Sequence, residues 1–339
     1  MAGIKRHRTQ GTPAAATSPF QILSLSGGGY RGLFTAVILE KLEQQAGRPL
    51  RECFDLIAGT SIGGILACGI AAGIPASQMR DAFERLGSGI FDRRLQMFGR
   101  RLFPVPRLGL LSARYSQAGL EKAIDEVLGG FSERGLGSIG KPLLVPSVSS
   151  TNATTVLFES GAFAGSRAAV VLRDVALATA AAPTYFPEHV IGENSFVDGG
   201  IVANAPDAIV IIKAMSSFGR HSSELKLLSV GTAAEAMGEV FRPGRASGVL
   251  RWMILRDLFG LTVTAQQALA VGLVRELLGS RYVRIDILPD KRRGKAIGLD
   301  KAGRTAADTL KELARRALED VSEQRGSDVA AMLRHIAAT

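Results

Sequence analysis

Ser61 lies in Gly59-Thr60-Ser61-Ile62-Gly63, between an apolar run that predicts a strand and a small-residue run that predicts a helix. This G-x-S-x-G pattern is typical of a nucleophile elbow, a tight strand-to-helix turn that carries a reactive serine. Gly59 and Gly63 suit such a turn because glycine tolerates strained backbone. The positive end of the following helix would favour an oxyanion beside the serine. The pattern therefore predicts a serine nucleophile, although it also fits a glycine-rich junction in an α/β core.

A serine nucleophile needs a base, and two kinds of candidate are present. Asp198 ends a predicted strand and precedes two glycines, which let a substrate or another backbone segment approach its carboxylate. A triad in the order Ser, Asp, His would instead use His221 or His335. His221 lies in a polar stretch typical of a surface loop, and His335 lies in the last predicted helix. A dyad of Ser61 and Asp198 is therefore favoured.

Gly27, Gly28 and Gly29 follow the first predicted strand and precede a helix. Because these glycines have no side chains to block access, their backbone N–H groups can converge on a small anion. In an open parallel sheet, both glycine turns would lie at the carboxyl ends of strands, where such sheets bind ligands. We therefore expect this loop to form the oxyanion hole for the Ser61 reaction.

Three blocks of sequence together resemble the signatures of patatin-like phospholipases. They are Ser26-Gly27-Gly28-Gly29-Tyr30-Arg31-Gly32, Gly59-Thr60-Ser61-Ile62-Gly63 and Asp198-Gly199-Gly200. Further stretches agree in the same order between Phe20 and Glu319, namely Ala181-Ala182-Pro183-Thr184-Tyr185-Phe186, Asn204-Ala205-Pro206 and Leu227-Leu228-Ser229-Val230-Gly231-Thr232. The resemblance implies a three-layer α/β/α fold with a largely parallel central sheet. It also implies a Ser61–Asp198 dyad that hydrolyses acyl esters of phospholipids without a metal or other cofactor.

The resemblance assigns supporting roles to residues next to the dyad and the glycine loop, which are Arg31, Gly59, Gly63, Gly199 and Gly200. Arg31 would either anchor the loop or contact a phosphate, and the anchoring role is favoured. The first block of this family often begins with Asp, whereas this chain has Ser26. That position is not the catalytic acid of the family, so the departure concerns only the hydrogen bonding of the loop.

Within this family, the chain is most similar to bacterial effectors of cyclic-oligonucleotide antiphage (CBASS) defence, which are equally compact. This resemblance implies activation by a cyclic dinucleotide from a partner nucleotidyltransferase, followed by degradation of the cell's own membrane. No apolar h-region follows the basic N-terminal residues, and the longest apolar stretch, Ala58 to Ile74, is a little short for a membrane span, so a cytoplasmic protein is expected. The resemblance implies that it associates with the inner membrane when active. No local motif identifies a nucleotide pocket, so a constitutive housekeeping lipid acyl hydrolase is the alternative.

The charge balance favours anionic partners, since 41 Lys and Arg against 31 Asp and Glu give a net charge of +10. Such a field suits both an anionic bilayer and an anionic second messenger. Nucleic-acid binding is disfavoured, because the basic residues are dispersed and no stacking platform or binding motif accompanies them. Cys53 and Cys68 lie in apolar segments, which indicates core residues in a reducing compartment and no disulfide or metal site.

The chain is interpreted as one phospholipase domain over residues 20–320, between a disordered basic tail at 1–19 and a C-terminal helix at 321–339. Residues 88–113 interleave large apolar side chains with arginines and contain two prolines. This insertion is interpreted as a lid that meets anionic lipid, or equally as a cap or a dimer contact that would make the protein a homo-oligomer.

Alternating strands and helices predict a largely parallel sheet that is covered on both faces. Strands are expected at 20–25, 53–58, 143–149, 155–159, 195–197, 225–230 and 282–287. Helices are expected at 33–45, 62–72, 76–85, 116–128, 175–182, 204–215, 249–278 and beyond residue 300.

Gly27-x-Gly29-x-x-Gly32 also matches the fingerprint of NAD- or FAD-binding oxidoreductases, with Asp55 at about the expected distance. The acid of that fingerprint ends the second strand, where it reaches the ribose. Asp55 instead begins the strand that leads to Ser61. An oxidoreductase is therefore the less favoured interpretation.

Overall fold

One mixed sheet organises the molecule in the computed structural model, which describes residues 19–90, 113–234 and 258–338. In this part of the chain, eight strands pair in the order β5-β6-β3-β2-β1-β7-β8, and β4 pairs with β3 outside that path. The strands are β1 (Phe20–Leu25), β2 (Leu56–Gly59), β3 (Leu143–Ser149), β4 (Thr154–Glu159), β5 (His189–Ile191), β6 (Asn194–Asp198), β7 (Leu225–Val230) and β8 (Tyr282–Ile285). The pairs from β3 through β2, β1 and β7 to β8 are parallel, whereas β4, β5 and β6 pair antiparallel.

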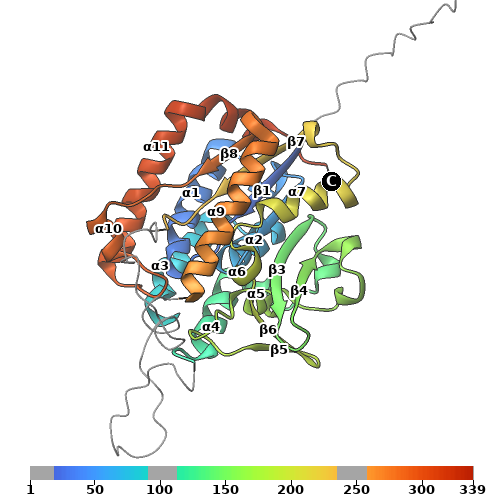
Figure 1. The fold of residues 1–339 in the computed structure, drawn as a ribbon, viewed down its shortest axis with the longest axis vertical. Coiled ribbons are helices and arrows are strands. Elements are labelled where there is room, and N and C mark those ends of the chain that lie inside the picture. The colour runs from blue at the N-terminus through green and yellow to red at the C-terminus, as the bar shows by residue number, and fades with distance from the viewer. Residues whose placement is uncertain (1–18, 91–112, 235–257, 339) are drawn as a thin grey trace, which may run out of the picture.

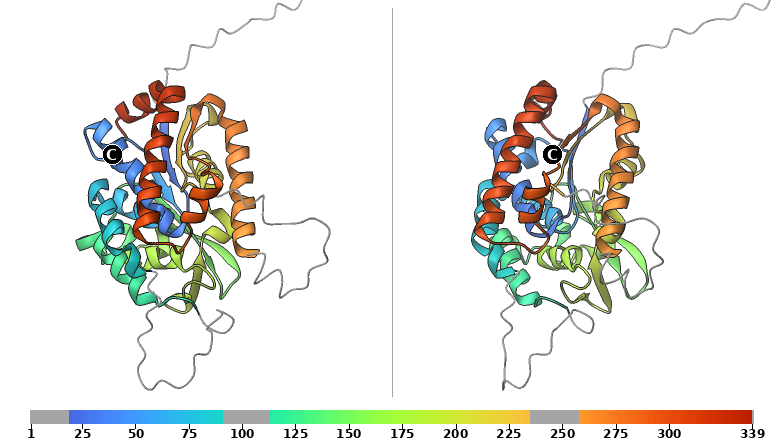
Figure 2. Two further views of the ribbon diagram at one scale, coloured as in Figure 1. Left: turned by 90° about the vertical axis from the view of Figure 1, so that its left-hand side faces the viewer. Right: turned by 60° about the vertical axis from the view of Figure 1, so that its left-hand side comes forward.

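Helices cover both faces of the sheet, and Figures 1 and 2 show the resulting three layers. One face carries α1 (Gly32–Ala46), α2 (Ile62–Ala72), α3 (Ala76–Ile90), α4 (Gln117–Leu128), α5 (Leu172–Ala180) and α11 (Arg304–Arg334). The other face carries α7 (Asp207–Ser217) and α9 (Leu258–Leu278). The short helices α6 (Gly200–Ala203) and α10 (Lys291–Ala296) follow β6 and β8. The predicted three-layer α/β/α fold with a largely parallel sheet is confirmed.

The register of the strands brings the predicted motifs to one edge of the sheet. Leu25 at the end of β1 lies beside Gly59 of β2 and Val230 of β7, so the glycine loop and the elbow leave the sheet side by side. β6 runs antiparallel to β3 and sets Asp198 opposite Ser147. β1 and β2 are buried along their whole length, as expected of parallel strands that are covered on both faces.

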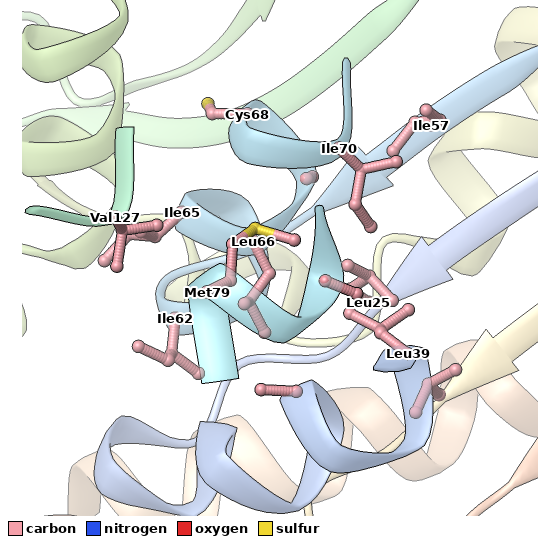
Figure 3. Close-up of a cluster of buried hydrophobic side chains, with 14 of the residues drawn as sticks. Leu25, Leu39, Ile57, Ile62, Ile65, Leu66, Cys68, Ile70, Met79 and Val127 are labelled. Atoms are coloured by element: carbon pink, nitrogen blue, oxygen red, sulfur yellow. The ribbon is translucent and has the colours of Figure 1, made fainter. Parts of the chain in front are cut away.

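Helix α2 is the centre of the larger apolar core, and every one of its residues is buried. Its side chains pack against those of β1, β2, α1, α3 and α4. Figure 3 shows part of this cluster, including Leu25 of β1 and Val127 of α4. A Cβ on Gly69 would lie 2.3 Å from the Met79 Sδ, so the glycine allows α3 to pack closely on α2. Cys68 lies in the same core, and burial raises the pKa of its thiol to about 12. No helix of the described residues has both the length and the apolar character needed to cross a membrane.

Short elements differ most from the sequence-based expectations. The helix expected from residue 204 begins at Asp207, after Pro206, while Gly200–Ala203 forms the separate helix α6. Proline fits this position because it has no N–H to leave unpaired at the start of a helix. β5, α6 and α10 were not expected, since each has six residues or fewer and too little periodicity to be recognised.

Several expectations concern residues that lie outside the described part of the chain. The basic tail at 1–19 and the insertion at 88–113 fall mostly in residues 1–18 and 91–112. The expected start of a helix at residue 249 also lies outside the described residues, which resume with α9. α11 runs through residue 320, where the sequence analysis places a boundary, and ends at Arg334.

Asp55 lies just before β2, at the ends of the strands opposite those that carry the glycine loop, and it anchors the C-terminal segment there. Its Oδ2 accepts a hydrogen bond from the Gln21 N–H at 2.7 Å and lies 2.9 Å from His335 Nε2. Its Oδ1 accepts the Ala338 N–H at 2.9 Å. The carboxylate is buried, and both of its oxygens contact groups of the protein, which argues against a ribose-binding role for Asp55.

We expect Asp55→Ala to lower the free energy of unfolding by about 1–3 kcal/mol, because it leaves the buried N–H of Gln21 without an acceptor and removes the acceptor that holds Ala338. Urea denaturation measures the change, with the exposed Glu323→Ala as a control that should stay within about 0.5 kcal/mol of the wild type. Equal stability of Asp55→Ala and the wild type would show that the C-terminal segment does not dock on this carboxylate.

Candidate active site

Ser61 occupies a strained turn between β2 and α2. Its φ of 55° and ψ of −126° are unusual for a residue with a side chain, and they place it immediately before the first turn of α2. A Cβ on Gly59 would lie 2.1 Å from the Gly63 carbonyl oxygen, and one on Gly63 would lie 2.4 Å from that of Leu25. The two glycines of the elbow are therefore required by the close approach of backbone segments.

Two threonines hold the elbow in place. The Ser61 N–H donates to Thr179 Oγ1 at 3.0 Å, and that hydroxyl donates to the Pro146 carbonyl at 2.6 Å. On the other side, Thr60 Oγ1 donates to the Ala203 carbonyl at 2.5 Å. Sequence analysis missed Thr179, whose only signal is a hydroxyl within an otherwise apolar, alanine-rich helix.

Ser61 and Asp198 are in direct contact. The Ser61 Oγ donates to Asp198 Oδ2 at 2.7 Å, and Asp198 Oδ1 accepts the Gly200 N–H at 2.6 Å. Asp198 is 3% exposed, and this burial raises the pKa of its carboxyl group from 3.8 to about 6, against the lowering effect of the two hydrogen bonds. A carboxylate with a pKa near the working pH can both accept and return the serine proton.

The glycine turn after Asp198 is also tightly packed. The Gly199 N–H donates to the Thr179 carbonyl at 3.3 Å, and a Cβ on Gly199 would lie 2.1 Å from the Pro146 carbonyl oxygen. A Cβ on Gly200 would lie 2.9 Å from Asp198 Oδ1. Both glycines thus let the backbone fold close enough to hydrogen-bond the carboxylate.

The glycine loop offers two amides to an anion beside Ser61. The Gly27 N–H donates to the Asn204 carbonyl at 2.9 Å, and the Tyr30 N–H donates to the Leu299 carbonyl at 2.8 Å. Within the described residues, the N–H groups of Gly28 and Gly29 have no protein acceptor. Gly28 and Gly29 therefore stay the predicted oxyanion donors, whereas the amide of Gly27, predicted as a third donor, is already used by Asn204.

Gly27 serves the site through its small size. A Cβ there would lie 3.1 Å from the Ser61 Cβ and 2.4 Å from Asn204 Oδ1. Arg31 holds the next part of the loop, since its Nε and its backbone N–H donate to the Gly28 carbonyl at 3.3 and 3.2 Å. The side chain of Arg31 also lines the cavity, so its placement is compatible with both expected roles, loop anchor and phosphate contact.

Ser26, the departure from the family pattern, belongs to a polar cluster beneath the loop. Arg284 Nη1 donates to Ser229 Oγ at 2.7 Å and to Ser26 Oγ at 3.4 Å, and Arg284 Nη2 pairs with Asp286 Oδ2 at 2.6 Å. Asp286 Oδ1 in turn accepts the Ala233 N–H at 3.0 Å. The hydrogen bonding of the loop therefore includes an ion pair from the end of β8 and needs no acid at position 26.

A cavity of about 190 Å³ opens beside Ser61 and Asp198. Its walls include apolar side chains from three helices and two loops, namely Phe83, Leu120, Phe186, Val263 and Ile297. Ligand sites commonly combine such apolar walls with a few polar groups that orient the ligand. The cavity is suited to an acyl chain whose ester group lies at the serine.

The histidines that the structure describes are all engaged elsewhere. His221 is exposed, and its Nδ1 lies 2.7 Å from Ser223 Oγ. His335 contacts Asp55 at the opposite edge of the sheet. His189 lies between Gln117 and Asp174. Neither triad candidate reaches the serine, so the geometry favours a base other than histidine.

A family model described as patatin-like phospholipase matches residues 23–211, more than half of the chain, and includes both Ser61 and Asp198. The chain belongs to the patatin-like phospholipase family. This confirms the resemblance that the three sequence blocks indicate. As a patatin-like phospholipase, the protein is a serine hydrolase that acts on lipid esters.

Three bacterial relatives, each named cGAMP-activated phospholipase, match this patatin-like phospholipase over most of its length. The protein of Pseudomonas aeruginosa is 36% identical over 314 residues, which cover 89% of this chain and 90% of the relative. That of Vibrio cholerae is 32% identical and covers 90% and 91%, respectively. That of Escherichia coli is 30% identical and covers 86% of each. The expected similarity to cyclic-dinucleotide-activated members of the family is confirmed.

The pKa of Asp198 predicts the pH dependence of this patatin-like phospholipase. With Asp198 as the base of the predicted dyad, only its carboxylate form can take the serine proton, so kcat/KM should level off above about pH 6 and fall about tenfold per pH unit below it. Hydrolysis of a soluble short-chain ester between about pH 4.5 and 8.5 measures the profile, with circular dichroism as the control for folding. A rate independent of pH across this range would contradict a base with this pKa.

Asp198 should also limit stability at neutral pH. Because its pKa is raised on folding, the folded state binds the proton more tightly, so the stabilisation is complete below about pH 4 and lost as the pH rises through about 6. The difference amounts to about 3 kcal/mol. Asp198→Asn keeps the shape without the charge, so we expect it to be inactive yet more stable than the wild type at about pH 7.5. Denaturation at about pH 4 should show no such gain; an equal gain at both pH values would refute this explanation.

Proposed function

We propose that this patatin-like phospholipase cleaves the acyl esters of membrane phospholipids with a Ser61–Asp198 dyad, and that a cyclic dinucleotide activates it in bacterial antiphage defence. The catalytic part rests on one observation, the 2.7 Å hydrogen bond from Ser61 Oγ to a buried carboxylate oxygen of Asp198. The regulatory part rests on the similarity to cGAMP-activated phospholipases over about nine tenths of the chain.

In the first step, Asp198 accepts the hydroxyl proton while Ser61 Oγ attacks the ester carbonyl carbon. The amides of Gly28 and Gly29 and the N-terminal end of α2 stabilise the oxyanion that forms. As the intermediate collapses, the carbon–oxygen bond to the lipid alcohol breaks, and Asp198 returns the proton to that alcohol. The lysophospholipid leaves, and the acyl chain stays on Ser61 in the apolar cavity.

In the second step, Asp198 accepts a proton from water, and the resulting hydroxide attacks the acyl-enzyme. The same amides stabilise the second oxyanion. Ser61 leaves with the proton from Asp198, and the fatty acid is released. The hydrogen bond from Gly200 to Asp198 Oδ1 orients the carboxylate, so that its Oδ2 faces Ser61 in both steps.

The proposed site of action is the inner face of the bacterial membrane, reached by peripheral association from the cytoplasm. The net charge of +10 suits an anionic bilayer and equally an anionic cyclic dinucleotide. We propose that residues 88–113, with their mixture of arginines and large apolar residues, meet the lipid. Degradation of the membrane would then follow from nucleotide signalling, and a constitutive housekeeping lipase is the alternative.

Release of fatty acid from vesicles of phosphatidylethanolamine and phosphatidylglycerol tests the proposal, with and without a panel of cyclic dinucleotides that includes cGAMP. We expect the wild type to release fatty acid only with one member of the panel. Ser61→Ala and Asp198→Ala should lose at least roughly 10³-fold of that rate, because each removes an obligatory partner in proton transfer.

His221→Ala is the matched control and should keep the wild-type rate, because His221 lies on the surface with Ser223 as its partner. Activity in folded Ser61→Ala would refute the dyad, and loss of activity in His221→Ala would restore the triad. Release that needs no nucleotide would favour the constitutive lipase.

A further inference from the structure

Asn204 lies where the three catalytic segments meet. Its backbone carbonyl accepts the Gly27 N–H at 2.9 Å, and its side-chain Nδ2 donates to the Gly27 carbonyl at 3.2 Å. Its Oδ1 would be 3.1 Å from a Cβ on Gly200, next to Asp198. The preceding residue, Ala203, accepts the hydroxyl of Thr60 in the elbow. The short segment after β6 therefore touches the glycine loop, the elbow and the turn that follows the base.

Helix α9 also hydrogen-bonds to this segment. The second N–H of the Asn204 amide donates to Gln267 Oε1 at 2.5 Å, and Gln266 Nε2 donates to the Gly200 carbonyl at 2.9 Å. Figure 1 shows α9 beside α6, and the N-terminal half of α9 contributes Val263 to the active-site cavity. Two adjacent glutamines thus connect α9 to the segment that carries Asn204.

The contact with Gln267 decides which way the Asn204 amide faces. Asn204 is 7% exposed, so both of its N–H groups need acceptors inside the protein. Gln267 and Gly27 provide them, whereas a rotated amide would set its oxygen against two carbonyl oxygens. Without the Gln267 oxygen, one buried N–H loses its acceptor, and only the Gly27 carbonyl still favours the orientation that holds Gly27, so this orientation is stabilised less.

The Gly27 carbonyl and the Gly28 N–H belong to one planar peptide unit, so the contacts of this carbonyl set the direction of the Gly28 N–H. The carbonyl accepts from Asn204 Nδ2 and from Thr232 Oγ1, the latter at 3.3 Å, and Asn204 also accepts the Gly27 N–H. Oxyanion donors act only when they point at the developing charge, and a misplacement of about 1 Å can cost roughly 10²-fold in rate.

We propose that Gln267 is a positioning residue, which acts through Asn204 and the Gly27 carbonyl to aim the amide of Gly28 at the oxyanion. Helix α9 thereby controls transition-state stabilisation from outside the catalytic motifs. This inference rests on the proposed serine mechanism, and it adds a residue of α9 to the machinery that carries it out.

Gln267→Met tests the inference, because methionine has a similar length and volume but no oxygen that can accept from Asn204. With a soluble short-chain ester, and with the activating nucleotide where it is required, kcat should fall roughly 10- to 100-fold while KM stays within about twofold. Gln267→Glu keeps an acceptor and should restore most of the rate. Leu269→Ala, an exposed residue of the same helix, is the control and should match the wild type.

A trifluoromethyl ketone lipid analogue separates positioning from a merely structural effect. The analogue adds to the serine as a hemiketal oxyanion, so its affinity reports on the amides of Gly28 and Gly29. We expect Gln267→Met to weaken this affinity by the same factor as kcat/KM, with Gln267→Ala as a second variant if Gln267→Met does not fold.

Unchanged kcat or unchanged inhibitor affinity in folded Gln267→Met would overturn the inference, as would equal losses in the Met and Glu variants. Failure of the proposed function gives a different result, namely an active Ser61→Ala. An inactive Ser61→Ala together with a fully active Gln267→Met would overturn the positioning role alone.

Discussion

The structure around the site depends on the contact between Ser61 and the buried Asp198 carboxylate, because a buried charge needs hydrogen-bond donors from the surrounding chain. A buried carboxylate is costly to ionise, and this one has two hydrogen-bond donors, the serine hydroxyl and the Gly200 N–H. Its raised pKa shows that this compensation is incomplete. A fully compensated carboxylate would be a weaker base, so the residual cost of ionisation suits Asp198 to the proposed proton transfer.

Close approach of backbone segments is the second constraint on the site. The elbow, the glycine loop and the turn after Asp198 come so near to one another that a single Cβ would collide with a carbonyl oxygen or a side chain. This explains why all three motifs are built around glycine. It also explains why the helix behind the serine consists mostly of Gly, Ala and Ile, since α2 must fit among the sheet, α3 and α4.

Much of this arrangement can be predicted from the sequence, because it depends on local patterns. The elbow and a largely parallel sheet covered on both faces follow from periodicity and from glycine spacing, the three-layer fold is implied by the family resemblance, and the fold is as expected. The dyad stays a prediction, although the structure does bring Ser61 and Asp198 together. The role of Gly27 could not be predicted, because its amide is bound by Asn204, which lies 177 residues away along the chain. Thr179 and Gln267 were missed for the same reason, since their partners are distant and their own surroundings carry no motif.

The sheet joins the two residues of the proposed dyad through a single strand, β3. This strand pairs in parallel with β2, which leads to Ser61, at Leu143 and Leu144, and antiparallel with β6, which ends at Asp198, from Ser147 onward. A strand advances about 3.3 Å per residue and alternates its faces, so one inserted or deleted residue between these two pairings would displace the acid and turn it away from the serine. The segment of β3 between these two pairings therefore fixes the distance from Ser61 to Asp198, and its length cannot change without separating them.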